Sequence, residues 1–287
     1  MTITVPWPST VAQFQLWSQV ALVWTVASYA FGDDPVGRGS LQALTGPLRA
    51  RWMKTLALRA AFAFALVLLL PGFSAAQVGS RLLLATNTAG LCALLSWGRL
   101  RIVTCSRTER LLAEWEVTMA LAFIGLSGIL VAVTGLTIER PVLLLPTTPG
   151  RVTAACTAAA AAVFAVRGGT HFVRGLLDKA GALPSVKAKA AEPASALAAK
   201  ATVIDTSEYN RGRAIGNLER VLMLVLVGVG SYEGLALIIA GKGLIRGKEL
   251  EDRDFAEYFI IGNLASVAAA LAIGIPLRPI VCHLWQL

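Results

Sequence analysis

Charged residues are scarce in this sequence. Only 15% of its 287 residues are Asp, Glu, Lys or Arg, against about 25% in an average soluble protein, while 56% are hydrophobic. A chain of this composition cannot bury its apolar surface in one water-soluble core. Lipid suits it better, because apolar runs near 20 residues match a hydrocarbon layer of about 30 Å at a rise of about 1.5 Å per residue. We therefore expect an all-α integral membrane protein.

Cysteine and histidine are also rare, with four and two residues. The cysteines lie far apart without a CxxC pair, which implies neither a zinc site nor a disulfide framework. The motifs of P-loop proteins, HExxH metalloproteases, GxSxG hydrolases and dinucleotide-binding folds are missing from the sequence. We expect no metal site and no cofactor. His171 lies beside Arg167 and Arg174, so we expect a solvated position near the membrane surface rather than a catalytic base.

Long uncharged runs predict seven membrane-spanning helices. They cover residues 11–31, 60–77, 82–98, 117–138, 152–166, 221–240 and 259–277. The fifth run is the shortest, since its 15 alanine-rich residues fall below the roughly 17 to 25 of a typical span. The runs divide the chain into three parts. These are a five-span region over 1–167, a cytoplasmic segment over 168–208 with a low-complexity linker, and a two-helix hairpin over 209–287.

Lys and Arg residues predict the orientation in the membrane. The connections on one side of the seven-span arrangement carry 19 of them and those on the other carry 7. The positive-inside rule then places the amino terminus outside and the carboxyl terminus in the cytoplasm. The turn over 242–253 is the exception, with four cations on the outer side. The net charge of +9 is spread between apolar runs, so we expect lipid and other membrane subunits, or a second copy of the chain, as partners and not nucleic acid.

Three motifs mark the region 209–275: RxIGxLER, then YE followed by an apolar run and AxKxLxR, then ELxDRxxAEYxxIG. They resemble the carboxyl-terminal hairpin of an uncharacterised family of bacterial multi-pass membrane proteins. The resemblance implies a structural hairpin with a polar turn, in a bacterial cytoplasmic membrane, and supplies no activity. Members of that family begin with a helix bearing a His and an Asp, which the first span of this chain does not have.

Glu233 is the only acidic residue inside a predicted span and lies 12 residues past its start, or about 18 Å along a helix. An unpaired buried charge is costly, so this carboxylate needs a partner or a proton. One interpretation makes it a proton or cation site with Arg59, Asn87 and Asn263 as candidate partners. The other places it at the end of a shorter or broken helix, because three nearby glycines ease a break.

Small residues recur every fourth position in the last two spans. They are Gly230 and Gly234 in the sixth span, and Gly262, Ser266, Ala270 and Gly274 in the seventh. Residues four apart share a helix face, where small side chains let two backbones approach closely. We therefore expect these two spans to pack on each other along the small residues.

The turn between these spans is rich in charge. Its charged residues include Lys242, Arg246, Glu249, Asp252, Arg253 and Glu257. Several opposite charges are four apart, and each such exposed pair stabilises a helix by about 0.2 to 0.5 kcal/mol. The turn is therefore interpreted as a solvated helical face, with a binding surface for a charged partner as the alternative.

Missing enzyme motifs and the small-residue stripes favour a non-enzymatic subunit or scaffold of a membrane assembly. The alternative is a proton- or cation-coupled transporter or channel that uses Glu233. A membrane enzyme acting on lipid is the third candidate, on the basis of the charged clusters at the predicted interfaces.

Overall fold

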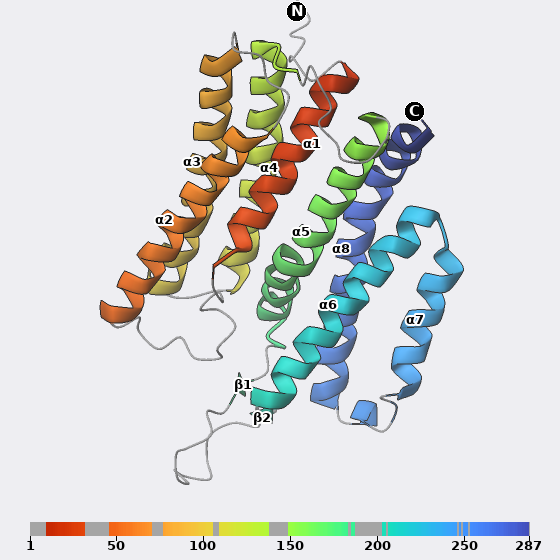
Figure 1. Ribbon diagram of the computed structural model, residues 1–287. Helices are drawn as coiled ribbons and strands as arrows, with labels where there is room; N and C mark the ends of the chain where they lie inside the picture. Colours follow the sequence, from red (N-terminus) through yellow and green to blue (C-terminus); the bar gives the residue numbers. More distant parts are fainter. Residues whose placement is uncertain are drawn as a thin grey trace, which may run out of the picture.

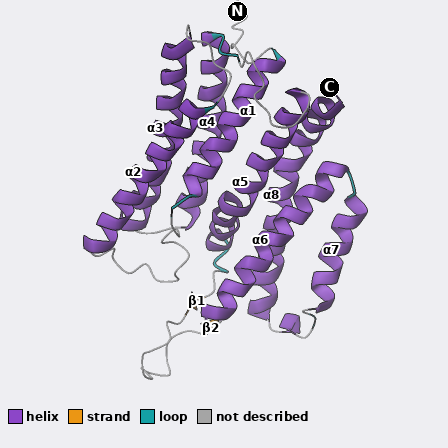
Figure 2. Ribbon diagram, in the orientation of Figure 1, coloured by secondary structure: helices purple, strands orange, loops and turns teal. Residues whose placement is uncertain are grey.

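A computed structural model describes residues 10–31, 46–70, 77–105, 109–137, 149–182, 185–186, 203–204, 206–245, 247, 249–251 and 253–286. Within these ranges the chain forms eight α-helices (Figures 1 and 2). They are α1 (Val11–Tyr29), α2 (Gly46–Leu69), α3 (Val78–Cys105), α4 (Glu109–Thr134), α5 (Pro149–Lys179), α6 (Thr206–Val229), α7 (Tyr232–Ile245) and α8 (Arg253–Gln286). A 3-10 turn, η3 (Glu249–Glu251), precedes α8, and the two-residue strands β1 (Ser185–Val186) and β2 (Val203–Ile204) pair in parallel. The predicted all-α class is confirmed.

The described helices run alternately down and up in the view of Figure 1. The start of α1 and the end of α8 consequently lie at the same end of the bundle. Helix α5 lies between the two halves of the chain, because it packs against α1 and α4 on one side and against α6 and α8 on the other. It runs through residue 167, where the sequence places a boundary between regions.

Among the described residues, five helices are long and apolar enough to cross a bilayer. They cover Ala50–Leu69, Val78–Val103, Glu109–Thr134, Gly150–Lys179 and Phe255–His283, and correspond to the second, third, fourth, fifth and seventh predicted spans. The protein therefore has the helices of an integral membrane protein, while seven spans are not confirmed. The short fifth run is part of a helix of 31 residues.

The first predicted span forms α1, a helix of 19 residues surrounded by other helices. It begins with a capping box, in which the Thr10 side chain accepts from the Gln13 N–H and the Gln13 side chain accepts from the Thr10 N–H. The side chains of Gln13, Gln15 and Ser18 are buried in the bundle. Their polarity lowers the hydropathy of α1, but neighbouring helices cover them.

The sixth predicted span is broken at Gly230. Helix α6 ends at Val229, Gly230 adopts a φ of +79°, and α7 begins at Tyr232. The Gly230 N–H bonds to the Val227 carbonyl and the Ser231 N–H to that of Leu226, which is the Schellman pattern that ends helices at glycine. A single helix over 221–240 is therefore wrong, because Gly230 reverses the chain.

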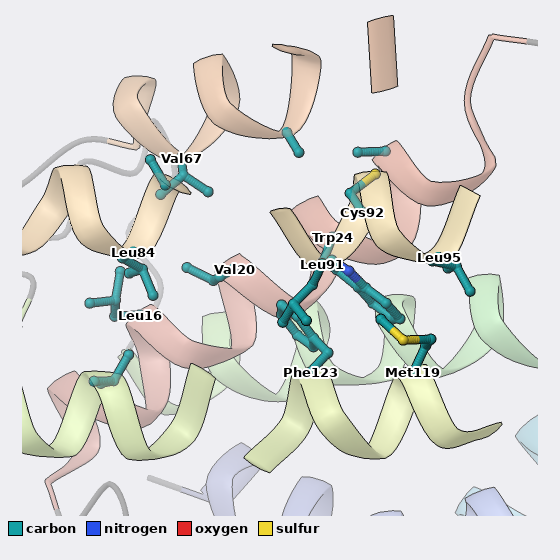
Figure 3. Close-up of a cluster of buried hydrophobic side chains, with 14 of the residues drawn as sticks. Leu16, Val20, Trp24, Val67, Leu84, Leu91, Cys92, Leu95, Met119 and Phe123 are labelled. Carbon is teal, nitrogen blue, oxygen red and sulfur yellow. The ribbon is translucent and has the colours of Figure 1, made fainter. Parts of the chain in front are cut away.

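Two apolar cores stabilise the two halves of the bundle. The larger core joins helices α1, α2, α3 and α4. Within it, Trp24 of α1 stacks on Phe123 of α4 with ring centroids 4.4 Å apart (Figure 3). The smaller core joins α6, α7 and α8 through Met223, Leu235 and Ala270. Most of the low-complexity linker predicted within 168–208 lies outside the described residues.

Candidate functional site

A buried ionic cluster lies where α1, α3, α4 and α5 meet. Arg99 and Glu116 are each 1% exposed, and His171 is 5% exposed. Arg99 donates from Nε to Glu116 Oε1 and from Nη2 to Oε2, the latter at 2.9 Å. The Tyr29 hydroxyl donates to Oε2 at 2.9 Å, and His171 Nε2 lies 3.8 Å from Oε1. We call these four residues the Glu116 cluster, because its carboxylate connects all four helices.

Two arginines of the bundle interior cap the end of α1. Arg99 Nη1 donates to the Ser28 carbonyl at 3.0 Å, and Arg59 Nε donates to the Ala30 carbonyl at 2.7 Å. The last carbonyls of a helix have no partner within the helix, and a cation there also complements the helix dipole. Glu116 neutralises Arg99 at this position. Arg59 is fully buried.

Glycines on α5 bring His171 close to Glu116. Gly168, His171 and Gly175 are spaced three and four residues apart, so they share one face of α5. A Cβ at Gly168 would lie 2.9 Å from the Tyr29 hydroxyl, and one at Gly175 would lie 2.5 Å from Cβ of Ala113. Because α5 has no side chain at these two points, it approaches α1 and α4 closely. The expected solvated position of His171 is wrong, since α5 continues beyond residue 166 and carries it into the bundle.

A second polar cluster joins α6, α7 and α8. Lys242 of α7 donates to the Glu219 carboxylate of α6 and, at 3.4 Å, to the side-chain oxygen of Asn263 of α8. Its ammonium also lies 5.6 Å from the ring centroid of Phe259. Glu219 and Lys242 are specified residues of the first two motifs of the 209–275 region. Phe259 stands at an unspecified position of the third motif, and Asn263 follows that motif. Residues distant in the sequence thus meet in one contact, which fixes α7 against its neighbours.

A third contact ties α5 to α6. Arg220 is buried, and its Nη2 donates to the Thr170 hydroxyl at 2.9 Å and to the Asn217 side chain at 2.5 Å. Thr170 also donates to Asn217. Thr170 directly precedes His171 on α5. These two adjacent residues connect α5 to different halves of the bundle, Thr170 to the half with α6 and His171 to the half with α4.

Glu233 lies at the start of α7 and not within a continuous helix. It is exposed in the first turn, where a carboxylate complements the positive end of the helix dipole. This position agrees with the broken-helix interpretation. The structure does not bring the predicted partners to it, because Arg59 bonds near the end of α1, Asn263 bonds to Lys242, and Asn87 lies on α3.

The small residues of α8 contact two different helices. A Cβ at Gly274 would lie 2.6 Å from Val227 of α6, and Ala270 belongs to the apolar core with that helix. A Cβ at Gly262 would meet Leu177 of α5 instead, at 3.9 Å. A separate two-helix hairpin is not supported, because α8 packs along α5 as well as α6. Of the other predicted packing residues, Ser266 is buried on α8. Gly230 lies next to the Arg278 guanidinium, and Gly234 lies next to Leu226.

Comparison with family models, with curated proteins and with solved structures finds no match for this chain. The resemblance of the 209–275 region therefore stays a prediction, and the site is interpreted from its own geometry.

The charged turn is divided between two environments. Arg253 and Glu257 form an exposed pair four residues apart, with Nε and Oε1 3.1 Å apart, as expected of a solvated helical face. Lys242 is instead part of the contact with Glu219. Glu249 lies in η3, whereas Arg246 and Asp252 fall outside the described residues.

The chemistry open to the Glu116 cluster is ion pairing and proton binding. The carboxylate accepts hydrogen bonds from a guanidinium and a phenol and faces an imidazole. Among the described residues no group of three His, Cys, Asp or Glu side chains is placed to hold a metal ion. Sequence reasoning missed the cluster because Arg99 and Glu116 each lie one residue outside a predicted span.

Proposed function

We propose that this protein is a non-enzymatic subunit or scaffold of a membrane assembly. The observation that supports this is the use of its interior charges. The Glu116 carboxylate connects four helices, Lys242 connects three, and Arg220 connects two. Bonded ionic groups inside a bundle can specify which helices pack together and in which register.

The alternative function is proton- or cation-coupled transport, and Glu233 does not support it. That carboxylate is exposed at a helix start. The specific observation in favour of transport is an imidazole 3.8 Å from a carboxylate in the interior, at His171 and Glu116. Ionisable residues inside membrane bundles often mark ion or proton pathways. No contact among the described residues supports the third candidate function, that of an enzyme acting on lipid.

Flux measurements separate the two functions. The wild-type protein and Glu116→Gln, which keeps the shape and one acceptor oxygen, would be reconstituted in vesicles under a pH gradient or a potential. We expect proton and cation flux from neither protein beyond that of protein-free vesicles. An added protonophore is the positive control for the detection of proton flux. Wild-type flux that Glu116→Gln abolishes would overturn the scaffold proposal and favour a transporter.

We further propose that six helices span the membrane and that α6 and α7 form a re-entrant hairpin. Helix α7 has 14 residues, a length typical of buried or re-entrant segments. The break at Gly230 returns the chain to the end of the bundle from which α6 starts (Figure 1). The spanning helices would be α1 to α5 and α8.

The distribution of Lys and Arg supports this arrangement. Eighteen of the 26 basic residues lie in the described part of the chain, and three of these belong to the end where α1 begins, because Arg81 and Arg151 lie in the first turns of α3 and α5 and Arg278 lies near the end of α8. The other 15 described ones belong to the opposite end, now including Lys242 and Arg253. The positive-inside rule then places that end in the cytoplasm and both termini outside. The resemblance of the 209–275 region implies that the membrane is that of a bacterial cell. The predicted cytoplasmic carboxyl terminus changes side because the break adds one reversal.

Cysteine labelling in intact cells tests the topology. Single cysteines at Ala180 and Gly247 in a cysteine-free background should both be protected from a membrane-impermeant thiol reagent. Ala180 is preferred to Gly181, whose φ of +70° disfavours a side chain. Native Cys282, exposed near the end of α8, should be labelled when it is the only cysteine. Labelling of one of the first two positions but not the other would contradict the re-entrant hairpin.

A further inference from the structure

We propose that Arg220 is the centre of a binding site between α5 and α6 for the phosphate group of an acidic membrane lipid. Three residues of α6 (Gly216, Asn217 and Arg220) and Thr170 of α5 form the site. This inference goes beyond the scaffold function and does not depend on it.

The hydrogen bonding of the Arg220 guanidinium carries the inference. Arg220 is only 4% exposed, yet its bonds go to neutral groups, the Thr170 hydroxyl at 2.9 Å and the Asn217 side-chain oxygen at 2.5 Å. A guanidinium has five N–H donors, and among the described residues only these two bonds, both from Nη2, engage those of Arg220. Its Nε is buried without a hydrogen-bond partner. A buried cation in this condition is costly, so an anionic ligand would stabilise it.

The carboxylates of the neighbouring helices do not compensate this charge. Each of three is already paired with another cation: Glu116 with Arg99, Glu109 with Arg174, and Glu219 with Lys242. Glu219 acts on Arg220 electrostatically from the adjacent position, but its carboxylate is bonded to Lys242. No described carboxylate lies within ion-pair distance of the Arg220 guanidinium. Since the three pairs are each close to neutral, the contact between α5 and α6 keeps the positive charge of Arg220.

The turn of α6 beside the guanidinium has room for a ligand. A long helical side chain lies over the turn that precedes its own Cα, which for Arg220 is the turn of Gly216 and Asn217. Both residues are partly exposed, and a Cβ at Gly216 would meet nothing within 4 Å. On the other side, a Cβ at Gly169 of α5 would lie 3.4 Å from Cδ of Arg220. Helix α5 therefore holds the side chain in place, and we place the phosphate in the open space beside Gly216.

The membrane supplies the anion that suits this position. Helix α6 starts at the end of the bundle that we place in the cytoplasm, and the Arg220 side chain is directed toward that end. Long basic side chains reach toward the headgroup layer in this way. Basic sites between membrane helices on the cytoplasmic side bind the headgroups of acidic lipids. Guanidinium N–H groups also bond charged phosphate oxygens more strongly than neutral acceptors, and the charge of Arg220 favours an acidic over a zwitterionic lipid.

Thermal melts with added ligand test the site. The full-length protein, purified in mild detergent and stripped of lipid, would be titrated with phosphatidylglycerol, phosphatidylcholine or sodium phosphate at constant ionic strength. A ligand that binds the folded state raises the melting temperature. We expect phosphatidylglycerol to act at a concentration at least tenfold below that of phosphatidylcholine, and sodium phosphate to have no effect at matched concentrations. No preference for phosphatidylglycerol would overturn the proposal, and an equal effect of sodium phosphate would overturn the lipid assignment in favour of a soluble anion.

Two substitutions separate the site from general surface attraction. Arg220→Gln keeps amide donors but removes the charge, and should raise the half-effective concentration of phosphatidylglycerol at least tenfold. Arg167→Gln is the matched control, because Arg167 is an exposed cation of α5 three residues before Thr170, and should change it less than twofold. Equal effects of the two substitutions would reject the site.

A third substitution decides the matter if Arg220→Gln does not fold. Gly216→Leu keeps Arg220 and fills the open space beside it, so it should also raise the half-effective concentration of phosphatidylglycerol at least tenfold. A folded Gly216→Leu protein that responds to phosphatidylglycerol like the wild type would overturn the proposal. None of these measurements depends on flux or on partner proteins, so a failure here leaves the scaffold proposal to its own test.

Discussion

Replacing Glu116 by Ala should lower the free energy of unfolding by about 3 to 5 kcal/mol, the range for removing one partner of a buried ion pair. The substitution leaves the Arg99 guanidinium buried beside the last carbonyls of α1 without its carboxylate. It also removes the acceptor of the Tyr29 hydroxyl. Unfolding by heat or SDS in mild detergent would measure the loss.

The matched control is Glu114→Ala on the same helix. Glu114 pairs with Arg110 at 2.7 Å, but the two side chains are 54% and 56% exposed, so the pair contributes at most about 1 kcal/mol. Replacing both buried partners, with Arg99→Met and Glu116→Leu, should recover much of the lost stability because no charge is left unpaired. Equal effects of Glu116→Ala and Glu114→Ala would show that the cluster does not hold the bundle together.

Hydropathy predicted the helices whose surfaces are apolar over a long run. The fourth predicted span, 117–138, overlaps α4 over 117–134, where the segment carries no charge, but α4 begins eight residues earlier, at Glu109. The fifth run gave a short segment because Arg167 and Arg174 interrupt it. In the structure, Arg174 pairs with Glu109 of α4, so its charge does not end the helix. Such a contact between distant residues leaves no local signal.

The break at Gly230 could be suspected but not placed from the sequence. Hydropathy averages over side chains, whereas the reversal depends on one backbone angle at Gly230 and on its two hydrogen bonds. Three glycines in this stretch offered the same freedom. Only the packing of α7 beside α6 and α8 decides which of them ends the helix.

Glu116 had a signal that span boundaries concealed. On α4 the buried positions include Leu112, Glu116, Met119 and Phe123, a spacing of three and four residues that marks one helix face. A carboxylate on that face predicts a buried partner. Because the predicted span begins at residue 117, Glu116 lies just outside it. His171 of α5 lies next to Glu116 only because the two helices pack together, and the local sequence does not predict that packing.

Gly274→Ala should destabilise the protein by about 1 to 3 kcal/mol, the usual cost of an added methyl group in a packed interior. A Cβ at Gly274 would lie 2.6 Å from Cγ1 and 3.0 Å from Cβ of Val227. Since Val227 is fully buried in the core of α6, α7 and α8, it cannot move aside without displacing Met223 or Ala270. We therefore expect α8 to shift away from α6 and the melting temperature in detergent to fall.

The control is Gly262→Ala, three turns earlier on the same helix. Its nearest neighbour would be the flexible end of Leu177 at 3.9 Å, an ordinary van der Waals distance. Alanine also favours helix over glycine by about 1 kcal/mol, so this variant should melt at an equal or higher temperature. The sequence treats the two glycines alike, as members of one stripe. A fall in melting temperature for Gly262→Ala with none for Gly274→Ala would mean that α8 turns a different face to α6 than the structure shows.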